Sequence, residues 1–317
     1  MRSTSLKNPV TFAVTTLISA QIVSLGSARN VQGDCAAGKP YCYDTPVHLD
    51  APVNTSGFEG KPSLSASGLE LYFVSDRPGA LGGPGDQDIY VTKRVSINAP
   101  WGTPERVPPP VSSEFFDITP TISIDGLDLY FGSNRPSAFS PPWPDLWVSH
   151  RASVNDPWGE PVNLGAGVNT TFFEGSIDIS PDQRTMYFAG VTPDFVFDIY
   201  VSTRDSTDEP FRPRVKLPAP VNSNGHDYGP ALTVDGRVMF FSSGTDNPFA
   251  PGAVNHLYVS ERQSDGTWGA RIYLDTLNCP TCFGGLPTIR AGGREICWMG
   301  NRGDSFGDMD IYCAIRR

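Results

Sequence analysis

The sequence predicts an all-β fold: a five-bladed β-propeller of four-stranded antiparallel blades, with the last blade closed by the N-terminal strand. Gly and Pro number 32 and 30 of 317 residues, about a fifth of the chain against an average of roughly 12%. Charged residues are only 18% and hydrophobic residues are 39%, which disfavours long surface helices and allows a large core. The third observation is an internal repeat, described next.

Each repeat begins with a short strand that ends in a hairpin turn. The last residues of the five strands are 58, 57, 53 and 57 positions apart. Most of the turns that follow contain Asp-Gly or Gly-Gly, which adopt the positive φ that tight hairpins need. The five strand segments are 61–65, 119–123, 176–180, 229–233 and 286–290.

The second and third strands of each repeat are also recognisable. The second strands are aromatic and apolar, as expected for strands buried on both faces; they are 71–73, 129–131, 186–188, 239–241 and 296–298. The third strands follow an Asp-Ile-Tyr-Val pattern, in which His256 replaces the Asp of the fourth repeat; they are 88–91, 145–148, 198–201, 256–259 and 310–313.

The fourth strands predict how the ring closes. Four copies follow third strands, three of them beginning with Trp-Gly, at 101–107, 158–164, 211–217 and 268–274. The fifth copy lies near the front of the chain, at 43–49, where Pro46, Val47 and Leu49 match the residues of the second copy. We therefore expect the N-terminal strand to complete the last blade, which removes two sheet edges.

The N-terminus is typical of an export signal. Arg2 and Lys7 are basic, residues 12–25 are mostly apolar, and small residues at 26–28 resemble a cleavage site. We expect a signal peptide at 1–28, a Cys-containing segment at 29–42 and a single propeller at 43–317, in a secreted or periplasmic protein. No other stretch approaches 18 apolar residues, so we expect no transmembrane helix.

The charge of the chain limits its partners. Formal net charge is −10 at pH 7, and removal of 1–28 deletes two basic and no acidic residues, which leaves −12. Such a surface repels phosphate backbones and disfavours nucleic acid. It is compatible with cations, basic proteins or neutral glycans.

Six cysteines in an exported chain favour disulfides. Two of them flank the borrowed strand and four lie in the last repeat, so all belong to the same composite blade: Cys35, Cys42, Cys279, Cys282, Cys297 and Cys313. We expect at least one N-terminal cysteine to bond to a C-terminal one, with Cys42–Cys313 as the preferred pair. A purely local set, such as Cys35–Cys42 and Cys279–Cys282, is the alternative. The Cys279–Cys282 motif lacks the partner residues of a zinc site.

Several short motifs carry a family resemblance. Leu-Tyr-Phe, Ser-Asp-Arg at 75–77, Ser-Asn-Arg at 133–135 and Asp-Ile-Tyr together resemble the TolB-type, WD40-like β-propeller repeat of bacterial exported proteins. The resemblance covers residues 43–317. It implies a protein-binding platform, with peptide or glycan contacts or an enzyme domain in some relatives, and a bacterial envelope setting.

One column of the aligned repeats, that is, one set of equivalent positions, contains candidate site residues. An acid stands just before four of the first strands, as Glu59, Asp117, Glu174 and Asp227, and Gly284 takes this place in the fifth. His226 adjoins the last of these acids. Five residues before the acids lie Asn54, Ser112, Asn169 and Asn222. Because first strands line the central channel of a propeller, we expect these groups to ring one mouth of it.

This column has three interpretations. Carboxylates and amides supply the six to eight oxygens that Ca²⁺ takes, so Glu59, Asp117, Glu174 and Asp227 are candidate metal ligands and Ca²⁺ is the candidate cofactor. Pairs of the acids suit general acid–base cleavage of a glycosidic bond, as in five-bladed arabinanase-type enzymes, with His226 as a further candidate. Alternatively, each acid belongs to the repeat and accepts backbone N–H bonds or pairs with a neighbouring Arg.

The sequence favours binding over catalysis. No nucleophile-elbow, Walker, zinc-protease or dinucleotide-binding motif occurs. We therefore expect an exported binding platform for a protein, peptide or glycan, with Asn54, Asn169 and Asn222 as candidate ligand-binding residues. The alternative function is a carbohydrate-active hydrolase or lyase that uses the acids at the channel mouth.

Overall fold

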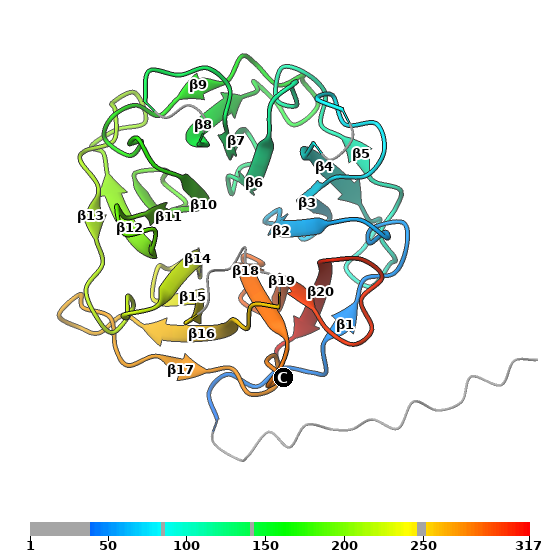
Figure 1. Cartoon of the computed structure of the whole chain (residues 1–317), viewed down its shortest axis with the longest axis vertical. Coiled ribbons are helices and arrows are strands. Elements are labelled where there is room, and N and C mark those ends of the chain that lie inside the picture. Colours follow the sequence, from blue (N-terminus) through cyan, green and yellow to red (C-terminus); the bar gives the residue numbers. More distant parts are fainter. Residues whose placement is uncertain (1–38, 84–85, 140–142, 246–251) are drawn as a thin grey trace, which may run out of the picture. The chain divides into compact units, whose positions relative to one another are not determined.

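The computed structural model describes residues 39–83, 86–139, 143–245 and 252–317, all within one compact unit, Gln32–Arg317. Five four-stranded antiparallel sheets surround a central axis, so the five-bladed propeller is confirmed (Figure 1). The expected signal peptide and Cys35 lie outside the described residues. Among the described residues, no helix is long and apolar enough to cross a membrane.

Four blades are built from consecutive strands. Their strands are β2 (Glu59–Leu64), β3 (Glu70–Ser75), β4 (Asp88–Lys93) and β5 (Glu105–Arg106); β6 (Asp117–Ile122), β7 (Asp128–Ser133), β8 (Asp145–His150) and β9 (Val162–Asn163); β10 (Glu174–Ile179), β11 (Thr185–Val191), β12 (Phe197–Thr203) and β13 (Val215–Lys216); and β14 (His226–Leu232), β15 (Val238–Gly244), β16 (His256–Glu261) and β17 (Ile272–Tyr273).

The fifth blade combines both ends of the described chain, as predicted. Its strands are β18 (Phe283–Ile289), β19 (Glu295–Asn301), β20 (Asp310–Ile315) and the N-terminal β1 (Val47–His48). Val47 pairs with Cys313 in the β1–β20 ladder. The His48 imidazole lies 2.7 Å from the Asp310 carboxylate, and both side chains are buried.

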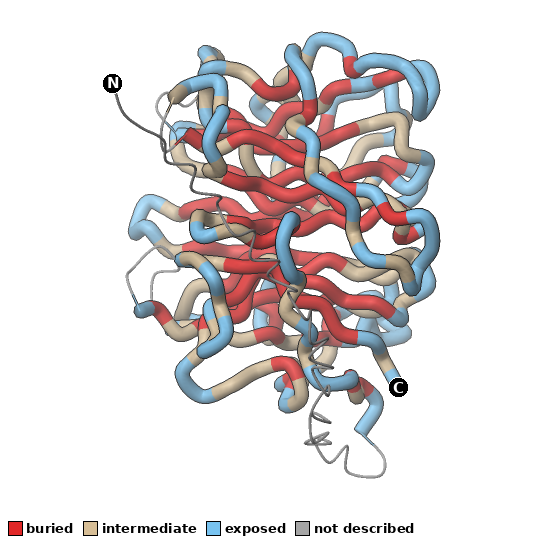
Figure 2. The backbone as a smooth tube through the Cα atoms, turned by 90° about the vertical axis from the view of Figure 1, so that its right-hand side faces the viewer, coloured by how far each residue is buried: buried red, intermediate tan, exposed pale blue. Residues whose placement is uncertain are grey.

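The core lies between neighbouring blades. The second strand of each blade places a fully buried aromatic residue there, namely Phe73, Phe131, Phe188, Phe241 and Trp298. Buried residues run along the strands, while exposed residues gather in the loops (Figure 2). Residues of adjacent repeats therefore share each apolar cluster, such as Tyr72 of the first blade with Leu129 of the second.

Each inner strand contains the same irregularity. The β2, β6, β10, β14 and β18 ladders shift register in the middle of the strand. The residue at the shift has a positive φ of 40° to 63°; the five are Lys61, Thr119, Ser176, Gly229 and Leu286. A bulge of this kind bends the strand and redirects a side chain, and four of these five residues carry one.

The expected Cys42–Cys313 disulfide is wrong. Cys313 bonds to Cys297, and Cys279 bonds to Cys282, so the C-terminal cysteines pair among themselves. Cys42 is itself disulfide-bonded. The physical reason is register: Cys297 and Cys313 are direct cross-strand partners with Cα atoms 4.0 Å apart. On the other side of β20, Val47 lies opposite Cys313 and Tyr43 lies opposite Arg316. Cys42 therefore lies beyond the end of β20 and not beside Cys313.

Candidate functional site

The four acids of the repeat column lie at the start of the inner strands, as expected, but they are fully buried. Each carboxylate accepts hydrogen bonds from the backbone N–H and the hydroxyl of the Ser or Thr four residues earlier. For Asp117, both bonds from Ser113 are 2.7 Å long. Thr55, Thr170 and Ser223 do the same for Glu59, Glu174 and Asp227.

An arginine also donates to each acid. In Asp117 and Asp227 it reaches the oxygen that the Ser leaves free, and in Glu59 and Glu174 it reaches the oxygen that also accepts from the Thr hydroxyl. The pairs are Arg77–Glu59 at 3.2 Å, and Arg135–Asp117, Arg214–Glu174 and Arg271–Asp227 at 2.6 Å each. Three of these arginines also donate to backbone carbonyls of the preceding inter-blade loop: Arg77 to 52 and 53, Arg135 to 110 and 111, and Arg271 to 220 and 221. These three pairs therefore fasten a blade entry to the loop before it.

This burial decides what the acids can do chemically. Desolvation raises the pKa of Asp117 and of Glu174, although Arg135 and Arg214 oppose the shift. A raised pKa suits a general acid, yet such a group must also reach the substrate. With no exposed surface and every oxygen hydrogen-bonded inside the protein, the acids serve as anchors in this structure.

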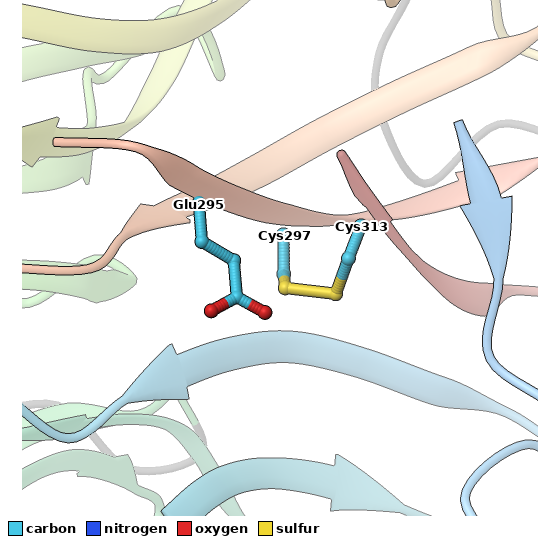
Figure 3. A group of neighbouring side chains, drawn as sticks. All are labelled: Glu295, Cys297 and Cys313. Atoms are coloured by element: carbon cyan, nitrogen blue, oxygen red, sulfur yellow. A yellow bond between two sulfur atoms is a disulfide. The ribbon is translucent and has the colours of Figure 1, made fainter. Parts of the chain in front are cut away.

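The four carboxylates also do not converge on a common point. Among the described residues, one group of His, Cys, Asp or Glu brings three ligand atoms within 4.8 Å of one another, and it is Glu295, Cys297 and Cys313. Figure 3 shows that the two sulfurs of this group are bonded to each other. Glu295 forms an ion pair with Arg94 at 2.7 Å. Neither set thus offers the free oxygens or thiolates that a cation needs.

The amide column is equally occupied. Asn54, Asn169 and Asn222 are buried, and each side chain bridges both polar groups of a third-strand residue. Asn169, for example, accepts from the Leu146 N–H at 2.8 Å and donates to the Leu146 carbonyl at 3.1 Å. Asn54 and Asn222 make the same contacts to Ile311 and Ile199. These amides hold loops against the sheet edge.

His226 packs beside an aromatic wall. Its ring lies 6.0 Å from the Phe197 ring, and its Nδ1 is 3.3 Å from the Phe197 backbone nitrogen. The adjacent Asp227 carboxylate is directed to Arg271 and Ser223. The structure thus brings His226 next to the channel lining, on the same wall as Phe197.

That lining encloses an aromatic hollow at one end of the channel. Its volume is about 580 Å³, within the range of ligand pockets. Phe58, Phe173, Phe197 and Phe283 line it, together with Met299 and Met309. Residues 60–61 and 118–119 of the inner strands form part of its wall, whereas residues 63–64 and 121–122 line a second hollow. The inner strands all begin at the same end of the channel, so their earlier residues lie near that end and their later residues near the other. The two hollows therefore lie at opposite ends of the channel.

The sequence analysis allowed an arginine partner for each acid, but it did not identify which arginines or which Ser/Thr residues bind the acids. The regular Ser/Thr spacing, four residues before each acid, was a usable signal. The arginines were harder to find, because two of them follow the second strand of their blade, whereas Arg214 and Arg271 lie just before the fourth strands β13 and β17. The aromatic hollow had a partial signal in Phe58, Phe173 and Phe283, which share one column.

Comparison with known proteins supports the fold. No protein-family model matches the chain, and no curated protein matches it. Among solved structures, the catalytic domain of a Coprinopsis cinerea GH62 α-L-arabinofuranosidase has a TM-score of 0.58 at 8% identity, covering 87% of this chain and 97% of that chain. The Bacillus subtilis arabinanase Arb43A has a TM-score of 0.54 at 14% identity, covering 82% and 94%. A putative TolB from Agrobacterium tumefaciens has a TM-score of 0.48 at 17% identity, covering 80% and 73%.

Proposed function

We propose that this chain is an exported binding platform that holds a protein or peptide ligand through an apolar group in the aromatic hollow. The observation that carries the proposal is a contrast between two parts of the same channel. The acids that would perform hydrolysis are buried in arginine pairs, whereas aromatic side chains of the described residues line the hollow. Concave sites lined by aromatic residues with few polar groups are the usual form of a ligand pocket.

The composition of the hollow favours an apolar ligand group over a sugar. Half of its described lining residues are Phe, Met, Ile, Leu or Val, and the polar or charged ones are Lys61, Gln87, Thr119, Ser176, Asn301 and Asp308. Aromatic side chains bury much area at low conformational cost. A glycan would bring many hydroxyls that need hydrogen-bond partners, and unsatisfied polar groups are costly to bury. An aromatic or aliphatic side chain of a peptide fits this lining better.

Filling the hollow tests the proposal. Ile118 lines it on β6, so Ile118→Trp is expected to abolish binding of peptides selected from a random phage-displayed library on the mature protein. Val162→Trp is the matched control, because Val162 is 62% exposed on β9 at the rim of the ring. Selected peptides should keep their affinity for this control, as measured by calorimetry.

A hydrolase would behave differently in the same preparation. Incubation with arabinan should release no reducing sugar from this protein. Release that disappears in Asp117→Asn or Glu174→Gln, in variants that melt at the wild-type temperature, would contradict the binding proposal and support catalysis.

Export is the second part of the proposal. Disulfides such as Cys297–Cys313 are typical of proteins outside the reducing cytosol, and the N-terminal residues have the pattern of a signal peptide. Expression of the full chain in a bacterial host should yield an exported protein that begins at Arg29, as shown by intact-mass measurement. A cytosolic product that retains residues 1–28 would refute this part.

A further inference from the structure

One of the five residues at the bulges of the inner strands is charged. Lys61, Thr119, Ser176, Gly229 and Leu286 occupy equivalent positions, and four of them are uncharged. Lys61 is 3% exposed and lines the aromatic hollow. It is the sole cationic side chain among the described residues that line it. The repeat does not require a lysine here, because Thr, Ser, Gly and Leu serve in the other blades.

The Lys61 ammonium has no close partner in the described part of the chain. No hydrogen bond or ion pair within 4.0 Å reaches it, and its electrostatic neighbour is Asp178 across the channel. Asp178 accepts the Leu232 N–H at 3.0 Å and lines the opposite hollow. Burial lowers the pKa of Lys61 and raises the pKa of Asp178. A buried ammonium without a direct hydrogen-bond acceptor is costly, and an anion beside it removes that cost.

The walls around Lys61 define the rest of the ligand. Phe58, Phe173, Phe283 and Met299 surround the hollow with apolar surface. Lys61 is its one cationic and Asp308 its one anionic lining residue among those described. One cation suits one negative charge, and both Asp308 and the net charge of −10 of the chain disfavour multivalent anions. The complementary molecule is therefore an apolar body that ends in a single carboxylate.

We propose that Lys61 binds the carboxylate of a ligand whose apolar body fills the aromatic hollow. Two sources share this chemistry: a free aryl or alkyl monocarboxylate, and the C-terminal carboxylate of a peptide whose last side chain is apolar. The inference rests on the proposed binding function and narrows it to ligands with a terminal anion. Lys61 acts by a charge-assisted hydrogen bond, which is the strong kind in proteins.

Two probe pairs test the charge requirement on the mature protein. One pair is 4-phenylbutyrate and the neutral 4-phenylbutanol. The other is a short glycine peptide ending in phenylalanine, with a free and with an amidated C-terminus. Calorimetry or ligand-observed NMR should show the charged member of at least one pair binding about ten- to a hundredfold more tightly than the neutral member. The pair that responds identifies the source of the carboxylate.

Variants assign the effect to Lys61. Lys61→Met keeps the approximate length of the side chain and should remove the preference for the carboxylate, and its melting temperature shows whether the fold is kept once Asp178 has lost its nearest cation. Lys93→Met is the control, since Lys93 is 66% exposed and forms an ion pair with Glu70. Asp178→Asn retains an acceptor for the Leu232 N–H and should tighten carboxylate binding several-fold, because it removes an opposing charge.

The outcomes separate this inference from the binding function. Equal affinity for charged and neutral probes, unchanged in Lys61→Met, would overturn the role of Lys61 and leave an apolar binding site. Weaker carboxylate binding in Asp178→Asn would place the anion away from Lys61 and overturn the inference as well. Absence of binding by all four probes, together with no Ile118-dependent peptide, would overturn both proposals.

Discussion

Replacing Asp117 by alanine is expected to destabilise the propeller by about 3–5 kcal/mol, the range for breaking a buried ion pair. The Asp117 carboxylate is 0% exposed and accepts bonds from Ser113 and from Arg135. Without it, the Arg135 guanidinium, whose side chain is 12% exposed, lacks its counter-charge. The loss should appear as a lower urea midpoint with an unchanged slope.

Two comparisons make this result specific. Asp205→Ala removes an acid that pairs with Arg212, but both side chains are more than half exposed, so the loss should stay below about 1 kcal/mol. Adding Arg135→Met to Asp117→Ala should recover part of the stability, because the uncompensated charge disappears. A loss of less than about 1 kcal/mol for Asp117→Ala would mean that the carboxylate is not the anchor described above.

Replacing Tyr43 by alanine is expected to cost about 3–5 kcal/mol, as for other large aromatic side chains in cores. Tyr43 is 1% exposed and packs in a cluster with Phe240, Trp298 and Tyr312. Its backbone also bridges to Arg316. The substitution therefore weakens the attachment of the N-terminal segment to the last blade. Thermal and urea unfolding of the purified protein measure the effect.

Tyr43→Phe is the matched control. In the described part of the structure, the buried Tyr43 hydroxyl has no hydrogen-bond partner. Its removal should leave stability unchanged or raise it slightly, because a buried unsatisfied hydroxyl is unfavourable. A large loss in the Phe variant would show that the hydroxyl has a partner and that ring packing is not the main contribution.

The fold was largely predictable from the sequence because turn residues recur at equivalent places in the repeats. The spacing of the repeat located every strand, and the match between 43–49 and the fourth strands located the closing strand β1. Each fourth strand is only two residues long, for example Glu105–Arg106. The seven-residue sequence pattern that marks these strands does not show how short they are. The disulfide of Cys313 depended on register, which spacing along the chain does not fix.

The candidate site was predictable in position but not in environment. The column of acids marked the start of the inner strands, yet its meaning depended on which side chains reach each carboxylate. Arg135 lies 18 residues from Asp117 and Arg271 lies 44 residues from Asp227. Because Arg135 follows the second strand of its blade and Arg271 precedes the fourth, no single spacing relates such arginines to the acids. In the sequence, Lys61 is one residue of an expected strand. Its place in the hollow depends on the bulge at this position, which the sequence pattern does not indicate.

The composite fifth blade also bears on how the chain acquires its structure. His48 and Asp310 are in contact although they are 262 residues apart, whereas the ladders of the other four blades join consecutive segments. Contact order is thus low in four blades and high in the last, and closing a long loop costs entropy before its contacts can form. Ring closure must wait until β20 is available, so a chain whose synthesis has not reached β20 cannot close the ring.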